Sequence, residues 1–216
     1  MDYFIDVLLM LPAVLIGLVF HEFAHGLAAD KLGDPTPRSY GRLTIEPWPH
    51  IDILGLIMIF IPPHIGWAKP VPIDPRNFRK PKRDEVIVSI AGPLMNLFIA
   101  IAFGFLLVAS LKFGLIGALQ AAQQGILVKI IQNIMVINIV LFVFNLIPIP
   151  PLDGSHIIAN LLPYNQAQKY RSIERYGFII LIILVLTNVL SYILSRPIEL
   201  IFGAIITIFS LLFGLI

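Results

Sequence analysis

The chain carries two histidines and a glutamate in an apolar stretch near its N-terminus, in the order His21-Glu22-Phe23-Ala24-His25. Because residues four apart lie on the same face of an α-helix, His21 and His25 can direct two imidazoles at one metal ion. Glu22 follows the first histidine by about 100° of helical rotation, close enough to activate a water molecule on that metal. This HExxH spacing is typical of zinc peptidases in which the glutamate is the general base.

The residues around this motif favour a metal site. The alternative is that these polar side chains only extend to the membrane surface from a helix end and have no chemical role. Residues 7–20 carry no charge, and the motif follows them directly at helical phase. A charged side chain at bilayer depth costs roughly 2.5–3.5 kcal/mol, so ionisable residues inside a membrane segment are candidates for function. Random shuffling of this composition would produce only about 0.003 such motifs, which argues against chance.

The composition predicts an integral membrane protein. Of the 216 residues, 58% are hydrophobic and 13% are charged, whereas about a quarter of a soluble domain is charged. A chain of this length has room for little beyond a helical bundle and short loops, so we expect residues 1–216 to form a single membrane-embedded domain in the lipid bilayer. The net charge of +2 argues against a nucleic-acid partner, and the absence of cysteine excludes thiol ligands.

Apolar segments long enough to cross a bilayer predict five spanning helices. They cover about residues 4–32, 86–111, 130–152, 176–195 and 197–216. A further segment at 51–61 reaches only about 16 Å as a helix, against a hydrocarbon core of roughly 30 Å, so it should enter the membrane and return. The expected fold class is an all-α polytopic membrane protein, a helical bundle of about five to six transmembrane segments with one re-entrant segment.

Two stretches outside these helices predict extended structure. Residues 42–46 alternate polar and apolar side chains as a strand does. In residues 66–75, prolines at 70, 72 and 75 exclude a helix and a central strand. We therefore expect a short β-hairpin or edge strand, in which the free backbone amides of Val71 and Ile73 pair with substrate by strand addition. His50 and His64 lie beside prolines at segment ends and are expected at the membrane interface.

A third metal ligand must come from elsewhere in the chain, because a catalytic zinc usually takes three protein ligands and one water. The best-placed candidate is Asp153, a lone carboxylate that follows the uncharged segment at 130–152 and precedes Gly154, where the backbone can turn sharply. Alternatively, Asp153 caps a short helix beginning at Ser155. Three other side chains are rival ligands, none of which directly follows the break at the end of a long span: Glu46, Asp52 and His156.

The chain resembles the site-2 protease family of intramembrane zinc metalloproteases. The resemblance rests on His21–His25 together with residues 145–154, which read Asn-Leu-Ile-Pro-Ile-Pro-Pro-Leu-Asp-Gly. Residues 92–96 match that family's GPxxN element, and residues 66–75 resemble the GWAKPVPxDP stretch of its small bacterial and archaeal members. The 18 residues at 112–129 leave no room for the PDZ domain inserted in larger members, and no CBS domain follows the last apolar segment.

This resemblance implies one zinc ion per chain, bound by His21, His25 and Asp153, with Glu22 as the base. It also implies that Asn145 and Asn96 steady the substrate or the oxyanion, a role that depends on geometry. The residues themselves also allow a structural role, because a buried amide can join two helices in lipid. Since Asn145 lies seven residues after another asparagine, on the same helix face, at least one of that pair can be structural.

Motif and resemblance together predict a metalloendopeptidase that hydrolyses transmembrane segments of other proteins, its membrane-protein substrates. They place it in the cell membrane of a prokaryote with the active site toward the cytoplasm. One alternative is a metal transporter that uses the same residues, but it would need more polar residues along the spans than the scattered asparagines present. The other is a proteolytically inactive protein with structural zinc, against which the intact Glu22 argues.

The distribution of basic residues predicts the orientation in the membrane. Lys and Arg favour the cytoplasmic side, and the stretches 31–50, 69–83 and 169–175 hold three, six and three of them. With five crossings and one re-entrant segment, the N-terminus should lie outside and the C-terminus inside. The histidine pair and Asp153 then meet at the cytoplasmic ends of their helices.

Overall fold

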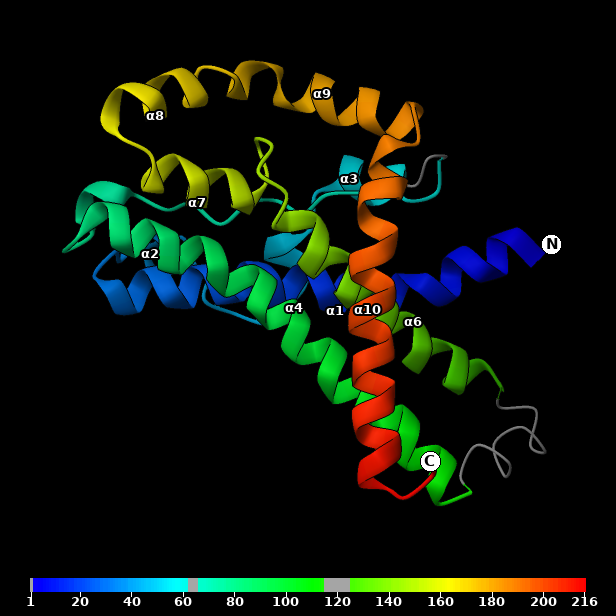
Figure 1. Cartoon of the computed structure of the whole chain (residues 1–216). Coiled ribbons are helices and arrows are strands. Elements are labelled where there is room, and N and C mark those ends of the chain that lie inside the picture. The colour runs from blue at the N-terminus through cyan, green and yellow to red at the C-terminus, as the bar shows by residue number, and fades with distance from the viewer. Residues whose placement is uncertain (1, 62–65, 115–124) are drawn as a thin grey trace.

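The computed structural model describes residues 2–61, 66–114 and 125–216, and within them all regular structure is helical (Figure 1). The order of elements is α1 (Asp2–Leu32), α2 (Thr36–Ser39), η1 (Trp48–His50), α3 (Ile53–Met58), η2 (Pro75–Asn77), α4 (Pro81–Lys112), α6 (Gly125–Asn145), α7 (Asp153–Leu161), α8 (Tyr164–Arg171), α9 (Glu174–Leu186) and α10 (Val189–Leu212).

Four of these helices are long and apolar enough to cross a membrane, and the chain is an integral membrane protein. They are α1 over Ile5–Leu32, α4, α6 and α10, with 28, 32, 21 and 24 residues. At 1.5 Å per residue each exceeds the roughly 30 Å of a hydrocarbon core. Helices α1, α4 and α6 pack against one another, and α10 packs against α4 and α6. The remaining short helices lie toward one end of this bundle (Figure 1).

The bundle is held by close packing between helices, because lipid tails are as apolar as its side chains. One buried cluster joins α4, α6 and α10 through Ala100, Leu107, Met135, Ile139 and Ile205. Gly104 lies where α4 meets α10, and a Cβ at that position would overlap the Ile205 side chain. A second cluster, of Ala13, Ile99 and Ile134, joins α1 to α4 and α6.

The predicted span at 176–195 is wrong. The helix ends at Leu186, and α9 has 13 residues, a length of about 20 Å that does not cross the hydrocarbon core. The chain turns at Asn188, whose φ of 57° is left-handed, a conformation that asparagine tolerates better than most residues. A single helix, α10, then continues through Pro197, where the sequence predicted a break. In Figure 1, α9 lies across the end of α10 rather than beside it.

The predicted β-hairpin is also wrong. Residues 42–46 are irregular, with a bend at 43 and 44, and no strand forms among the described residues. One isolated antiparallel bridge joins Ile51 to Ala68, and the Lys69 N–H donates to the His50 carbonyl at 2.9 Å. Prolines at 70 and 72 remove the next backbone donors, so the ladder cannot continue. Between these segments α3 has only six residues, too few to cross a membrane as a helix.

The proline-rich segment Lys69–Asp74, called the strap below, is fastened to the chain that follows α1. Arg42 donates from Nη1 to the Pro70 carbonyl at 3.0 Å and from Nη2 to the Lys69 carbonyl. The buried Asp34 carboxylate accepts from the Asp74 N–H at 2.8 Å and from Asn77 Nδ2 at 2.8 Å. Burial would raise the pKa of Asp34, but the hydrogen bonds from Thr36, Asn77 and Asp74 lower it overall.

His50, expected from the sequence at a membrane interface, is packed inside this same region. It is 1% exposed, and its Nε2–H donates to the Thr44 carbonyl at 2.8 Å. Its Nδ1 lies 3.5 Å from Arg42 Nη2, from which it can accept. Burial, assisted by the Arg42 charge, lowers the pKa of His50, so its ring is neutral. The other interfacial candidate, His64, lies outside the described residues.

Candidate metal centre

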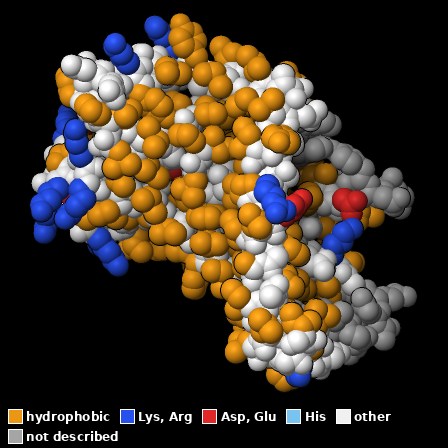
Figure 2. Space-filling model, viewed as in Figure 1, with side chains coloured by type: hydrophobic (Ala, Val, Ile, Leu, Met, Phe, Trp, Pro, Cys, Tyr) orange, Lys and Arg blue, Asp and Glu red, His pale blue; other side chains and the backbone are white. Residues whose placement is uncertain are grey.

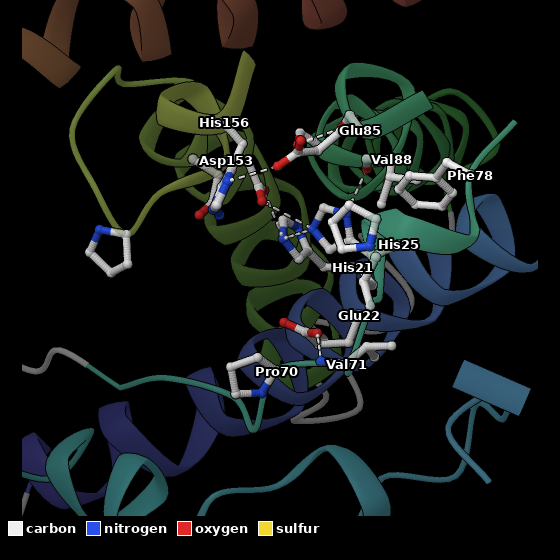
Figure 3. A pocket seen from close by; sticks show the side chains of 15 residues that line it. His21, Glu22, His25, Pro70, Val71, Phe78, Glu85, Val88, Asp153 and His156 are labelled. Atoms are coloured by element: carbon white, nitrogen blue, oxygen red, sulfur yellow. Dashed lines mark hydrogen bonds and ion pairs between the residues drawn. The ribbon is translucent and has the colours of Figure 1, made fainter. Parts of the chain in front are cut away.

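Two histidines of α1 and the first residue of α7 meet in the interior of the protein (Figure 3). His21 Nε2 lies 3.2 Å from Asp153 Oδ2, and His25 Nε2 lies 3.3 Å from Asp153 Oδ1. The two Nε2 atoms are 2.9 Å apart. Both histidines are buried, at 6% and 7% exposure. The structure therefore brings together all three side chains that the sequence predicted as ligands.

Hydrogen bonds on the far side of each ring determine which nitrogen carries the proton. His21 Nδ1 lies 2.6 Å from Asn96 Oδ1, and His25 Nδ1 lies 2.7 Å from the Val88 carbonyl. Both partners are acceptors, so each Nδ1 carries a hydrogen, and in the neutral imidazole that a metal ligand requires each Nε2 then presents a lone pair. Two lone pairs facing each other at 2.9 Å repel unless a cation lies beside them.

Asp153 supplies the charge that such a cation needs. Its Oδ2 is buried and has no hydrogen-bond partner among the described residues. The ligand atoms of the two histidines and the carboxylate all lie within 4.8 Å of one another. Two imidazole nitrogens and one carboxylate oxygen form a donor set that fits zinc, with a coordination position left over. The alternative role of Asp153 is not observed, because it lies inside the first turn of α7 and its side chain caps nothing.

Asn96 lies behind His21 rather than in the cavity. Its Nδ2 donates to the Gly17 carbonyl at 3.0 Å and to Asn138 Oδ1 at 2.9 Å, which turns its Oδ1 toward the histidine. Asn138 Nδ2 donates in turn to the Ile134 carbonyl at 2.8 Å. Both asparagines are fully buried. Asn96 is thus an orienting group for the imidazole. Asn138, the asparagine seven residues before Asn145, for which the sequence left a structural role open, supports Asn96 at the site.

Gly92 explains why a glycine opens the Gly-Pro-x-x-Asn element. A Cβ at this position would overlap the His25 ring and would come within 2.7 Å of His21 Cε1. The glycine therefore lets α4 approach both imidazoles, and Asn96, about one turn later in the same helix, reaches His21.

The loop between α6 and α7 holds Asp153 in place from the other side. Tyr170 of α8 donates from its hydroxyl to the Pro148 carbonyl at 2.6 Å. A Cβ on Gly177 of α9 would overlap the Pro150 carbonyl, so the helix packs directly on the loop. Gly154 likewise has no room for a Cβ, because it faces the carbonyls of residues 146 and 147. The short helices α8 and α9 thus position the carboxylate.

A cavity of about 360 Å³ opens beside the three candidate ligands. Glu22 and Asn145 both line it, and Asn145 Nδ2 donates to the Leu141 carbonyl at 2.9 Å. Glu22 is turned toward the strap, where its Oε2 accepts from the Val71 N–H at 2.7 Å (Figure 3). The Val71 amide is therefore not free, contrary to the prediction, whereas the Ile73 N–H has no hydrogen-bond partner among the described residues.

The rival ligands lie outside the cluster. Glu46 is exposed, and Asp52 caps α3 by accepting from the Gly55 N–H at 2.8 Å. His156 lines the cavity, but its Nδ1 faces Glu85 Oε1 at 3.6 Å. The hydrogen bond to Glu85 raises the pKa of His156 against the effect of burial.

Comparisons with known proteins point to a family of peptidases. Residues 111–188 match Peptidase family M50. A protein of Bacillus subtilis named as a zinc metalloprotease, YwhC, is 39% identical over 200 residues, which cover 93% of this chain and 90% of that protein. Two mycobacterial proteins, both named as the zinc metalloprotease Rip2, are similar over shorter shares. The protein of Mycolicibacterium smegmatis is 27% identical (85% of this chain, 69% of its own length), and that of Mycobacterium tuberculosis H37Rv is 31% identical (82% and 66%).

No solved structure gives a significant match to this chain. The similarity to the Bacillus protein, 39% identity over 93% of this chain, is nevertheless sufficient to assign the protein family. The chain belongs to peptidase family M50, the site-2 protease family.

Proposed function

We propose that this protein is a zinc-dependent intramembrane endopeptidase that hydrolyses peptide bonds in or beside the transmembrane segments of other membrane proteins. The observation that carries the proposal is the close approach of the Nε2 atoms of His21 and His25, which face each other and the Asp153 carboxylate. The names of the relatives, which designate zinc metalloproteases, support the choice of metal. One zinc ion per chain fits the single cluster found among the described residues.

In this proposal the ligands bind the metal and the other cavity residues handle the proton and the peptide. Zinc bound by His21, His25 and Asp153 would act as a Lewis acid that polarises water and the scissile carbonyl. Glu22, next in the chain to His21, accepts the proton of the attacking water and returns it to the departing amine. Asn145 faces the same cavity and can hold the substrate backbone.

The depth of the site supports an intramembrane reaction. His21 lies eleven residues before the end of α1, about 17 Å along the helix axis, within the apolar segment that is long enough to cross a membrane. A helical substrate hides its carbonyls in its own hydrogen bonds, so it must unwind before Glu22 and the metal can act on it. The strap lies beside the cavity and offers an extended backbone with which an unwound segment can pair.

The test is co-expression with candidate single-span membrane proteins. We expect the wild-type protein to cut such a protein, and Glu22→Gln to reduce cleavage by about 10²- to 10⁴-fold, the usual effect of losing a general base. Equal cleavage by both proteins would refute the role of Glu22. In the same cells, metal transport unaffected by the protein would separate a peptidase from a metal transporter.

A further inference from the structure

The strap has two edges that make different contacts. In an extended chain, successive residues direct their N–H and C=O groups to opposite sides. On the edge away from the cavity, Arg42 binds the Pro70 carbonyl and Asp34 accepts from the Asp74 N–H. On the edge toward the cavity, the Val71 N–H meets Glu22. The edge away from the cavity, called the back edge, is therefore held by hydrogen bonds to Arg42 and Asp34. The edge toward the cavity, called the front edge, is bonded to Glu22, the proposed base.

The front edge has two donors to offer a substrate. By the same alternation Val71 and Ile73 direct their amides to the front edge, whereas the prolines at 70 and 72, which have no N–H, lie on the back edge. The Val71 N–H is already 2.7 Å from the Glu22 carboxylate. A carboxylate is a stronger acceptor than a peptide carbonyl. A substrate that pairs along the whole front edge must therefore take this donor from Glu22.

We propose that the Val71 N–H is a shared positioning group, exchanged between Glu22 and the substrate. Without substrate it holds the Glu22 carboxylate against the strap. When an extended substrate segment pairs with the strap, one of its backbone carbonyls takes the Val71 N–H, and Glu22 is released to accept a proton. This inference rests on the proposed function, because it assigns the order in which the base and the substrate use the same donor.

The exchange gives a physical reason for selecting unwound segments. A helical segment keeps its carbonyls in internal hydrogen bonds, so it has no acceptor to offer the strap and leaves Glu22 bonded. An extended segment can bond both Val71 and Ile73, and the second bond compensates for displacing the carboxylate. The base is then free only when an extended backbone is already in the cavity. Val71 itself is 7% exposed, so water does not readily substitute for either partner.

The first measurement detects the contact directly, without any substrate or cleavage. The full-length, zinc-loaded protein labelled with ¹⁵N-valine is studied in detergent, with Val71→Ile used to assign the Val71 amide. We expect this amide to exchange slowly with deuterium in the wild type and at least about tenfold faster in Glu22→Ala, which removes the acceptor. Glu85→Gln is the matched control, because Glu85 lines the same cavity but pairs with His156 and Arg171, and it should leave the exchange unchanged.

The second measurement tests the competition. The probe is an uncharged, blocked peptide of four Val-Ser repeats carrying a fluorophore, and its binding is compared among variants. We expect affinity to rise from wild type to Glu22→Gln to Glu22→Ala, by about tenfold in all, because the competing acceptor is weakened and then removed. In the Val71→Pro background, which removes the shared donor from a segment already rich in proline, the gain from Glu22→Ala should disappear.

The outcomes separate this inference from the proposed function. Unchanged Val71 exchange in Glu22→Ala, or a probe that binds that variant no more tightly than wild type, overturns the shared donor even if the protein is a peptidase. Faster exchange and tighter binding support it, whether or not a cleavage substrate has been found. Equal zinc content in all variants would show that the changes in amide exchange and probe binding do not come from a changed metal site.

Discussion

At the scale of single residues, the two histidines are oriented by different means. His25 is bonded to a backbone carbonyl, that of Val88, whereas His21 depends on the side chain of Asn96. A side chain can be removed without breaking the helix, so the orientation of His21 can be tested by mutation. Partners of this kind fix the tautomer and ring angle of a ligand, and their loss typically weakens metal binding by about 10- to 100-fold.

We therefore expect Asn96→Ala to weaken zinc binding by about 10- to 100-fold, as measured by competition with a fluorescent chelator. Asn133→Ala is the matched control. Asn133 Nδ2 donates to the Leu9 carbonyl at 3.2 Å, another asparagine contact between spans but outside the site. If Asn96→Ala binds zinc as tightly as Asn133→Ala, the orienting role is wrong.

A second residue-scale prediction concerns the space in front of the imidazoles. Gly92→Ala should abolish zinc binding and cleavage, because the new Cβ would overlap the His25 ring and crowd His21. Gly203→Ala is a control within a membrane helix, since a Cβ there meets nothing within 4 Å. Full activity of Gly92→Ala would show that the two helices can separate without affecting the site.

At the scale of elements, the strap and the loop after α6 are held by polar contacts that no periodicity reveals. Asp34 is the main anchor, since it gathers the Asp74 N–H, the Asn77 amide and Thr36 at the end of α1. An asparagine at this position would keep one acceptor and present a new donor to groups that are themselves donors. The buried donors left unpaired would each cost about 1–3 kcal/mol.

Asp34→Asn should therefore lower the free energy of unfolding of the detergent-solubilised protein by about 1–3 kcal/mol, as measured by thermal unfolding. The pKa of Asp34 is lower in the folded protein than in the unfolded chain, so its contribution is complete above the ordinary carboxyl range and is lost as pH falls through the folded pKa. The stability difference between wild type and variant should accordingly shrink in acid. A difference that stays constant from neutral pH to below about pH 3 would contradict this assignment.

The sequence predicts those parts of the fold and site whose signal is local. Spacing within one helix identified His21 and His25, and apolar length located α1, α4 and α6. The errors came from residues whose effect depends on tertiary contacts. Pro197 was predicted to begin the last span, but it lies inside α10, and the actual break is at the left-handed Asn188.

The site residues that sequence reasoning missed share one property. Asn138, and the contact that Val71 makes with Glu22, depend on partners 42 and 49 positions away in the chain; Val71 itself was predicted, but only as a group that pairs with substrate. Their types are ordinary for a membrane helix and a proline-rich loop, so nothing local distinguishes them. Asparagines within the apolar segments of α4 and α6 did indicate buried amides that need hydrogen-bond partners. That they lead to His21 could be known only from the packing of the helices.

At the scale of the whole molecule, the ends of the spans lie on two sides. Phe113, just after α4, packs on Phe213, just after α10, with ring centroids 6.1 Å apart. Lys129 near the start of α6 bonds Asp6 near the start of α1, at 2.6 Å. These four positions therefore mark one end of the bundle. Most Lys and Arg side chains in Figure 2 gather at the other end, over α2, α8 and the start of α4.

Four crossings change the predicted topology. With α9 too short to cross, the C-terminus should lie on the same side as the N-terminus, outside, rather than inside as five crossings required. Single cysteines at positions 40, 78 and 168 should be protected from an impermeant thiol reagent in intact cells, and cysteines at 113 and 216 should react. The cysteine-free chain makes this labelling specific. Protection of position 216 together with labelling of position 113 would place them on opposite sides of the membrane and would show that the chain crosses five times.

The most direct test of the account is the zinc content of purified protein, measured by mass spectrometry of the metal per chain. We expect close to one zinc in the wild type and in Glu22→Gln, because Glu22 is a base and not a ligand. Asp153→Ala should lose most of the zinc, because its carboxylate is the charged member of the predicted ligand set and lies within 3.3 Å of both imidazole Nε2 atoms. Zinc bound by Asp153→Ala as fully as by the wild type would contradict the account.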